Sequence, residues 1–260
     1  MNIRRNSINS TGGSFLGFFY HQCQIIKRYF TNFVFPPFCP ICERELKGNE
    51  RLICNDCYNS VRLIEAPFCR RCGAPLKNNG KPCVYCKNNH FHFSRVRALG
   101  TFSSPLSEMI HLLKYDRKTS IAEHLGILLG NLLLSDPELS SANTIIPIPL
   151  HKTRMRERGY NQSRLLAEMV SSISHKRLSI NAVIRAKATK SQTQLAPGER
   201  AKNLKDAFTV VSKEMVKNRK IIVVDDVMTS GATLDEISKP LLEAGAETVY
   251  GLILARAIGN

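Results

Sequence analysis

One segment of this chain, residues 221–234, constrains its fold more than any other. Its sequence is Ile-Ile-Val-Val-Asp-Asp-Val-Met-Thr-Ser-Gly-Ala-Thr-Leu. The first four residues are β-branched, which is typical of a strand covered on both faces of a sheet. Asp225 and Asp226 then stand at the carboxyl end of that strand, where open α/β sheets bind ligands. Residues 229–233 add hydroxyls, a glycine and the first N–H groups of a helix, which favour an anion. The segment therefore predicts an α/β domain with a sugar-phosphate site.

The same residues resemble the phosphoribosyl-diphosphate (PRPP) binding motif of type I phosphoribosyltransferases. The hydrophobic run, the acid pair and the Val-Met-Thr-Ser-Gly-Ala-Thr run follow in the order of that motif. The resemblance implies that the two carboxylates bind the ribose hydroxyls and that the turn binds the 5′-phosphate. The expected PRPP-binding residues are Asp225, Asp226, Val227, Met228, Thr229, Ser230, Gly231, Ala232 and Thr233, with Asp225 and Asp226 as the candidate catalytic residues. No Walker lysine follows the turn, and an ordinary strand–turn–helix junction with capping Asp and Thr residues is the alternative.

The charge of the chain agrees with a phosphate-bearing ligand. Lys and Arg number 37 against 21 Asp and Glu, which gives a formal net charge of +16. Such a field attracts nucleotides, nucleic acid or an acidic membrane surface, and the charge alone does not choose among them. The 260 residues allow one medium α/β domain and a small module, and 43% hydrophobic residues exclude a wholly disordered chain.

Cysteine spacing predicts a metal-binding module. Eight of the nine cysteines form four Cys-x-x-Cys pairs, namely Cys39/Cys42, Cys54/Cys57, Cys69/Cys72 and Cys83/Cys86. Each pair can point two thiolates at one ion, and four thiolates make a closed, structural zinc site. Two sequential four-cysteine zinc ribbons fit best. A cross-braced pairing is also geometrically possible, and an iron–sulfur cluster is the alternative centre. Because the module is too small for a large core, metal binding is expected to supply much of its folding energy.

A second phosphate-binding candidate follows the strand expected at residues 144–149. Four cations stand there against one acid, Glu157. We expect a loop that holds a highly charged leaving group such as pyrophosphate, since Arg can fork onto its oxygens and positive charge stabilises it. The candidate residues of this pyrophosphate loop are Leu150, His151, Lys152, Arg154, Arg156 and Arg158. A solvated basic loop is the alternative.

Residues 185–200 form a third candidate stretch, which is polar, basic and long for a connection. Long loops in compact domains are often active-site lids. The flexible-loop residues that would cover a substrate are Lys187, Lys190, Gln192, Gln194 and Arg200. Composition alone fits a plain exposed loop equally well.

Strands and helices alternate along the rest of the chain. Strands are expected at residues 95–102, 144–149, 182–185, 221–224 and 248–255, and helices at 105–115, 120–134, 161–174, 199–207 and from the motif to about residue 245. Such alternation is typical of a parallel sheet flanked by helices. We therefore expect three parts: an N-terminal segment with an amphipathic helix (1–38), a double zinc ribbon (39–88) and a phosphoribosyltransferase domain (95–260).

The N-terminal segment bears on where the protein is located. Helical apolar spacing at residues 13–38 predicts a helix packed on the rest of the protein, with a membrane-surface helix as the alternative. We find neither a secretory signal nor an apolar run long enough to span a membrane. The expected home is a reducing cytoplasm, with a peripheral membrane contact left open.

Taken together, these stretches resemble the ComF family of competence-type phosphoribosyltransferase-like proteins. The resemblance covers residues 36–257. It rests on the cysteine pairs, Leu-Leu-Lys-Tyr at 112–115, Pro-Ile-Pro-Leu with Arg-Glu-Arg-Gly-Tyr-Asn-Gln, Lys-Ser-Gln-Thr-Gln with Arg200 and Asn203, and the acid-pair motif. It implies a type I phosphoribosyltransferase fold behind a cysteine-rich zinc domain, and a role in natural transformation, in which imported single-stranded DNA is handled at the cytoplasmic face of the membrane.

Two function classes follow from the sequence. The first is a phosphoribosyltransferase of unknown acceptor, in which Mg²⁺ bridges PRPP. The second is a nucleic-acid-binding or regulatory protein with a non-catalytic PRPP-sensing pocket. Aromatic residues are only 7% of the chain, so base stacking has few candidates, and core packing is the other role for the best of them, Phe91 and Phe93. Single-stranded DNA, other competence proteins and a second copy of the chain stay open as partners.

Overall fold

A computed structural model describes residues 37–76, 83–87, 89–187 and 205–258 of the chain. It divides into two compact units, Met1–Cys57 and Tyr58–Asn260. The amphipathic helix predicted within residues 1–38 lies outside the described residues, apart from its last two positions. No helix in the described ranges is both long and apolar enough to cross a membrane.

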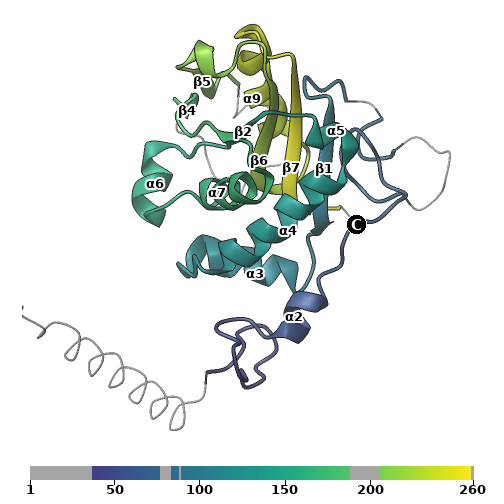
Figure 1. Cartoon of the computed structure of the whole chain (residues 1–260), viewed down its shortest axis with the longest axis vertical. Coiled ribbons are helices and arrows are strands. Elements are labelled where there is room, and N and C mark those ends of the chain that lie inside the picture. Colours follow the sequence, from purple (N-terminus) through teal and green to yellow (C-terminus); the bar gives the residue numbers. More distant parts are fainter. Residues whose placement is uncertain (1–36, 77–82, 88, 188–204, 259–260) are drawn as a thin grey trace, which may run out of the picture. The chain divides into compact units, whose positions relative to one another are not determined.

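The second unit is built on a five-stranded sheet with the order β1-β7-β6-β2-β3 (Figure 1). Every neighbouring pair runs parallel. The strands are β1 (Arg95–Thr101), β2 (Thr144–Pro147), β3 (Arg177–Leu178), β6 (Lys220–Met228) and β7 (Thr248–Arg256). The predicted parallel sheet is confirmed, and β6 continues past the expected end of its strand to include the acid pair.

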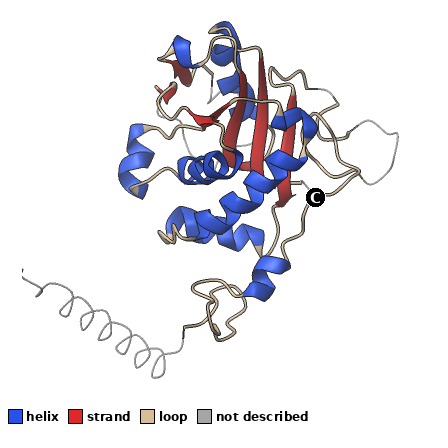
Figure 2. Ribbon diagram, in the orientation of Figure 1, coloured by secondary structure: helices blue, strands red, loops and turns tan. Residues whose placement is uncertain are grey.

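Helices cover both faces of this sheet (Figure 2). The described helices are α2 (Asn55–Asn59), α3 (Leu106–Tyr115), α4 (Ile121–Ser135), α5 (Pro137–Ser140), α6 (Lys152–Arg158), α7 (Gln162–Ser174) and α9 (Ala232–Glu243), and a 3-10 turn, η2, lies at Lys213–Met215. Helices α4 and α7 lie on one face and α9 on the other. The fold is thus a three-layer α/β arrangement, as the alternating pattern indicates.

Two local features differ from the prediction. The strand expected at 182–185 is confirmed as β4 (Val183–Arg185), but it pairs antiparallel with β5 (Phe208–Val210) in a separate ribbon rather than in the main sheet. The loop expected at the basic stretch is the helix α6. His151 caps its first turn by accepting a hydrogen bond from Thr153 N–H, and Gly159 ends it in the left-handed conformation. Of the helix expected at 199–207, only the last three residues are described, and they form a turn.

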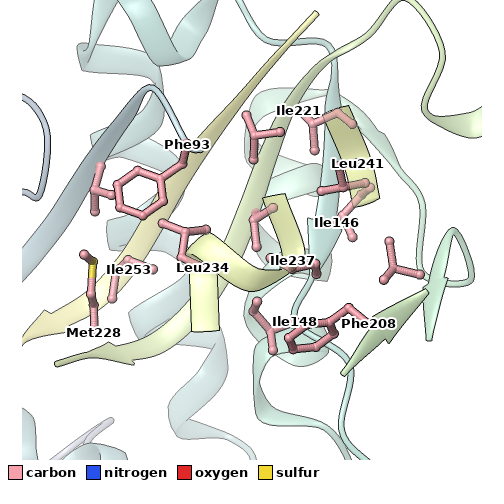
Figure 3. Packing of buried hydrophobic residues seen from close by; sticks show 14 of the residues in the cluster. Phe93, Ile146, Ile148, Phe208, Ile221, Met228, Leu234, Ile237, Leu241 and Ile253 are labelled. Carbon is pink, nitrogen blue, oxygen red and sulfur yellow. The ribbon is translucent and has the colours of Figure 1, made fainter. Parts of the chain in front are cut away.

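The sheet and α9 enclose the main apolar core. Ile221, Ile222, Val223 and Val224 of β6 are fully buried, which confirms that this strand is covered on both faces. Figure 3 shows α9 side chains, including Ile237, packed against residues of the neighbouring strands. Burial of this strand fixes where its carboxyl end emerges, and so fixes the position of the acid pair that follows.

The second cysteine cluster belongs to the same compact unit as the sheet. Cys72 and Cys86 are buried in the apolar cluster that also contains Val96 and Ile253. Two backbone hydrogen bonds close the turn between Cys69 and Ala74: Gly73 N–H donates to Cys69 O, and Cys69 N–H donates to Ala74 O. Val96 N–H of β1 donates to Arg70 O across 3.4 Å, which joins this turn to the sheet. The domain boundaries that the sequence predicts near residues 39, 88 and 95 stay predictions.

Helices α4 and α7 approach each other closely at Gly126 and Gly130. A Cβ atom built on Gly126 would lie 2.4 Å from Met169 Cβ, and one on Gly130 would lie 2.8 Å from Ile173 Cβ. Real side chains do not approach this closely, so these two positions of α4 accept only glycine without movement of α7.

We expect Gly126→Ala to destabilise the protein, although alanine is the better helix former. The usual helix-propensity gain of about 1 kcal/mol is outweighed by overpacking, which typically costs about 1–3 kcal/mol. The free energy of unfolding in urea should therefore fall by roughly 1 kcal/mol or more. Asn131→Ala, at an exposed position of the same helix, serves as the control and should be neutral or stabilising. Equal or higher stability of the Gly126 variant would contradict the packing argument.

Candidate functional site

The eight paired cysteines form two separate clusters. Cys39, Cys42, Cys54 and Cys57 make one, and Cys69, Cys72, Cys83 and Cys86 make the other, with all sulfurs of a cluster within 4.8 Å of one another. Neighbouring sulfurs lie 3.5 to 3.8 Å apart. Four sulfurs bound tetrahedrally at about 2.3 Å from an ion would be about 3.8 Å apart. The clusters therefore have the donor type and spacing of four-thiolate metal sites, and each joins sequential pairs rather than cross-braced ones.

The acid pair lies at the carboxyl end of β6. The Asp225 carboxylate accepts hydrogen bonds from Ser163 Oγ at 3.0 Å and from the Asp226 N–H at 2.9 Å. Asn161 brings Ser163 into place, because its side chain caps α7 and also donates to Ile148 O. The first turn of α7 and the end of β6 thus hold Asp225 from two sides.

Burial raises the pKa of the Asp225 carboxyl to about 7, and the charge of Asp226 adds to the rise. Lys114, the Asp226 N–H and the Ser163 hydroxyl oppose it. Two carboxylates side by side in a poorly solvated place resist being ionised together. A carboxyl that titrates near neutrality is common at functional sites.

Asp226 is paired with a cation from a distant part of the chain. Lys114 Nζ lies 2.7 Å from Asp226 Oδ1, and the aspartate side chain is only 5% exposed. Its second oxygen, Oδ2, is buried without a hydrogen-bond partner among the described residues. An unsatisfied carboxylate oxygen costs free energy, so its persistence here indicates a position prepared for a ligand.

A cavity of about 410 Å³ opens beside the acid pair. It is lined by Phe102, Ser107, Ile110, His111, Lys114, Tyr115, Ile148, Leu150, His151, Arg154, Arg158, Gln162, Arg185, Asp225, Asp226, Val227, Thr229, Thr233 and Ala257. The predicted motif and the predicted basic stretch, which are some seventy residues apart in the sequence, therefore meet in one cavity.

The helix α6 divides the four predicted cations between two surfaces. Arg154 and Arg158, one turn apart, line the cavity together with Leu150 and His151, whereas Lys152 and Arg156 are exposed and do not. A loop would not impose this division, but residues at i and i+4 of a helix share a face. Arg158 is further held by Gln162, to which it donates a hydrogen bond, and by the Tyr115 ring.

The turn after β6 has the conformation that the motif predicts. Gly231 has φ +89° and is the residue before the first turn of α9. A Cβ there would lie 2.8 Å from the Met228 methyl group and 3.3 Å from the Phe91 ring. Thr229 and Thr233 line the cavity. The N–H of Ala232 donates to Ser230 Oγ at 3.4 Å. Only glycine suits this position, and the first turn of α9 begins at the cavity edge.

Most of the predicted flexible loop cannot be placed. Lys190, Gln192, Gln194 and Arg200 lie outside the described residues. Lys187 is described and is exposed, where it donates to Lys205 O and lies 3.7 Å from Asp206 Oδ2. It does not line the cavity. The role of these residues stays a prediction.

The predicted site did not include three polar side chains near the acid pair: Lys114 and Arg185, which line the cavity, and Ser163, which donates to Asp225. Arg185 ends β4 and is close enough to the acid pair for Asp225 to affect its titration; burial lowers the pKa of its guanidinium, Asp225 opposes this, and Arg154 adds to it. One sequence signal pointed to Lys114, its place in the Leu-Leu-Lys-Tyr run, and one pointed to Arg185, its place at the end of a predicted strand.

Two family models match the chain. A double zinc ribbon domain matches residues 30–87, and a phosphoribosyl transferase domain matches residues 164–257. The first match covers both cysteine clusters, and the second covers the acid pair and the turn.

Curated relatives match along most of their length. The DNA utilization protein YhgH of Escherichia coli O6:H1 is 34% identical over 226 residues, which are 86% of this chain and 98% of the relative. Competence protein F of Haemophilus influenzae is 34% identical over 224 residues, 84% of this chain and 96% of the relative. The chain belongs to the ComF family. A further member, competence protein ComFC of Bacillus subtilis, is 27% identical over 229 residues, 82% of this chain and 87% of that protein.

The ComF family assignment and the strand order together establish the fold as that of a phosphoribosyltransferase domain preceded by cysteine-rich ribbons. A solved glutamine PRPP amidotransferase of B. subtilis aligns with 52% of this chain and 26% of its own, at 20% identity and a TM-score of 0.36. That likeness is too low to add to the assignment.

The raised pKa of Asp225 in this ComF protein predicts how its stability depends on pH. The folded pKa of about 7 exceeds the ordinary value of 3.8. Between these values the folded state binds more protons, so the free energy of unfolding should fall as pH rises from about 4 to 7, by on the order of 3 kcal/mol. Asp225→Asn should remove most of this fall, measured by urea unfolding at pH 5, 6, 7 and 8.

The matched control is Glu243→Gln, which removes an exposed carboxyl from α9. It should leave the pH dependence of the parent protein unchanged. An Asp225→Asn variant with the parent's pH dependence would show that this carboxyl titrates at its ordinary value.

Proposed function

We propose that this ComF-family chain binds PRPP with Mg²⁺ in the cavity at the carboxyl end of β6. The observation that carries the proposal is the acid pair, in which Asp226 Oδ2 is buried with no hydrogen-bond partner among the described residues while Arg154 and Arg158 line the same cavity. A ligand with hydroxyls, several phosphates and a divalent cation complements such a mixture of carboxylates and guanidinium groups.

The acid pair suits Mg²⁺ in its donor type. Mg²⁺ prefers carboxylate and phosphate oxygens and keeps much of its water, so one or two carboxylates beside a bound diphosphate suffice. Asp226, with its unsatisfied oxygen, and Asp225, with a pKa near neutrality, would hold the hydrated ion and the ribose hydroxyls. When bound, the ion would neutralise negative charge on the diphosphate.

Three parts of the cavity would bind three parts of PRPP. The acid pair would bind the ribose, the turn at residues 229–233 would bind the 5′-phosphate at the start of α9, and Arg154 and Arg158 would bind the diphosphate. If transfer occurs, the C1–O bond to pyrophosphate breaks as a nucleophile attacks C1, and the departing charge goes to the two arginines. Positioning and electrostatic stabilisation would supply most of the rate.

We propose that the biological setting is DNA uptake and use. Relatives of this chain are called DNA utilization protein and competence protein. The net charge of +16 supports an encounter with single-stranded DNA. Two zinc ions are the proposed occupants of the cysteine clusters, with a structural role, and the proposed location is the cytoplasm at the inner face of the membrane. Other competence proteins and a second copy of the chain are the proposed protein partners.

A second candidate is a PRPP sensor without turnover. It is favoured by one feature of the described cavity: neither histidine in its lining is a buried side chain free to act as a base, since His111 is mainly exposed and His151 accepts a hydrogen bond from Thr153 N–H. Release of pyrophosphate separates the two candidates. A transferase releases it when the acceptor is present, whereas a sensor binds PRPP and releases none.

The proposal predicts that binding of PRPP requires the acid pair. Titration calorimetry of the zinc-loaded protein with PRPP and Mg²⁺ should give a dissociation constant in the micromolar range. The double variant Asp225→Asn/Asp226→Asn should weaken it at least about 100-fold, since each lost charge-assisted contact costs about 1.5–3 kcal/mol.

The control variant Glu243→Gln/Glu247→Gln removes two exposed carboxylates with the same change in net charge. It should bind PRPP as the parent protein does. No binding of PRPP by the folded, zinc-loaded parent would end the PRPP proposal and leave DNA binding as the leading function.

The helix α6 provides an internal comparison. Arg154→Gln/Arg158→Gln removes the two cations that line the cavity and should raise the dissociation constant for PRPP about 100-fold. Lys152→Gln/Arg156→Gln removes two exposed cations from the same helix and should change it by less than about threefold, because exposed charges act weakly and are screened. Equal effects of the two double variants would show that α6 acts only through its net charge.

A further inference from the structure

A buried arginine joins the turn at residues 229–233, called the phosphate turn below, to the second cysteine cluster. Arg256, the last residue of β7, is 2% exposed. Its guanidinium donates to backbone carbonyls on two sides, and no acidic side chain of the described ranges forms an ion pair with it. A buried charge held only by carbonyl dipoles is costly and calls for a functional explanation.

On one side Arg256 holds the start of the phosphate turn. Its Nη1 atom donates to Met228 O at 3.0 Å, to Ala257 O at 2.7 Å and also to Thr229 O. In a trans peptide the C=O of one residue and the N–H of the next point in opposite directions. The arginine therefore turns the N–H groups of Thr229 and Ser230 away from itself, in the turn proposed to bind the 5′-phosphate.

On the other side Arg256 holds the metal knuckle. Its Nε donates to the carbonyl of Cys72 at 3.2 Å, and Cys72 is one of the four thiols of the second cluster. The guanidinium carbon also lies 5.7 Å from the centre of the Tyr85 ring, between the cluster cysteines 83 and 86. The same side chain thus contacts both knuckles of this cluster.

The segment that follows the cluster makes a second link to the turn. Phe91 stacks on Phe93 with ring centroids 4.5 Å apart and would be in contact with any Cβ at Gly231. His92 donates its N–H to Asp235 Oδ1, in the first turn of α9, across 2.6 Å. Phe93 itself is buried near Leu234 (Figure 3). The core role of Phe93 that the sequence allowed is therefore observed.

We propose that Arg256 is a positioning residue for the phosphate turn and that it couples this turn to metal binding at the second cluster. The proposal rests on the proposed PRPP site. With the cluster loaded, Cys72 O and the turn carbonyls are held at fixed positions around one guanidinium. Without metal, the knuckle loses its tetrahedral constraint, and Arg256 loses one of its two anchors.

The coupling has a readout that needs no ligand. Hydrogen–deuterium exchange of the amides at residues 229–233 should speed up about tenfold in the full chain when the second cluster loses zinc, a size typical of coupling between two sites. Cys83→Ser/Cys86→Ser removes the second cluster, and Cys39→Ser/Cys42→Ser removes the first as the matched control. Only the former should speed up exchange of the turn. Unchanged exchange, or an equal change in both variants, would overturn the coupling.

Arg256 itself is tested by two substitutions. Arg256→Lys keeps the charge but lacks the planar fork that reaches carbonyls on two sides, and Arg256→Met keeps the volume without charge. Both should speed up exchange at residues 229–233 in the zinc-loaded protein. The Met variant should also raise the dissociation constant for PRPP at least tenfold, with the lysine variant restoring only part of the affinity. Parent-like exchange and affinity in both variants would remove Arg256 from this role.

A third measurement covers the case in which the variant of the second cluster, Cys83→Ser/Cys86→Ser, fails to fold. Thermodynamic linkage requires that bound PRPP raise the affinity for the metal by the same factor as the bound metal raises the affinity for PRPP. In Cys39→Ser/Cys42→Ser protein, which keeps only the second cluster, PRPP should raise the zinc affinity several-fold in an equilibrium competition with a chelator, and Arg256→Met should abolish the rise. A zinc affinity unaffected by bound PRPP would overturn the coupling. If the parent protein fails to bind PRPP, the proposed function falls, and exchange at the turn alone decides the inference.

Discussion

Burial of β6 on both faces is the constraint on which the rest of the second unit depends. Ile221 to Val224 are covered by α7 on one side and by α9 on the other, so the strand can occupy only the middle of the sheet. Its carboxyl end then delivers two adjacent carboxylates to the edge at which β2 also ends. The cavity is assembled there because α3, α6, α7 and β4 all contribute side chains to that single edge.

Local patterns predicted the parts of the site whose geometry is set within a few residues. The acid pair, the glycine turn and the cysteine knuckles each carry their geometry in a short segment, and the structure groups the cysteines as the spacing favoured. Lys114, Ser163 and Arg185 could not be placed from sequence, since they reach the acid pair through packing of distant elements. The helix α6 was predicted as a loop because a run of charges is typical of an exposed loop. The two signals of the helix are the capping His151 before it and Gly159 after it.

The two cysteine clusters differ in their surroundings although their spacings are nearly the same. The first lies in the smaller compact unit. The second shares an apolar cluster with β1, β6, β7 and α9, so its thiols are part of the core of the phosphoribosyltransferase domain. Sequence repeats alone suggested two equivalent ribbons. Packing shows that the second ribbon is built into the apolar cluster that also contains Met228, next to the turn at residues 229–233.

The ion pair between Lys114 and Asp226 stabilises the site when no ligand is bound. Two neighbouring carboxylates repel each other, and a fold that waited for an external cation to separate them would be unstable alone. Lys114 acts as a resident counter-ion that neutralises one carboxylate in the free protein. Under the proposed function, a hydrated metal ion would meet a carboxylate that already has one positive partner, in a fold that is complete before the ligand binds.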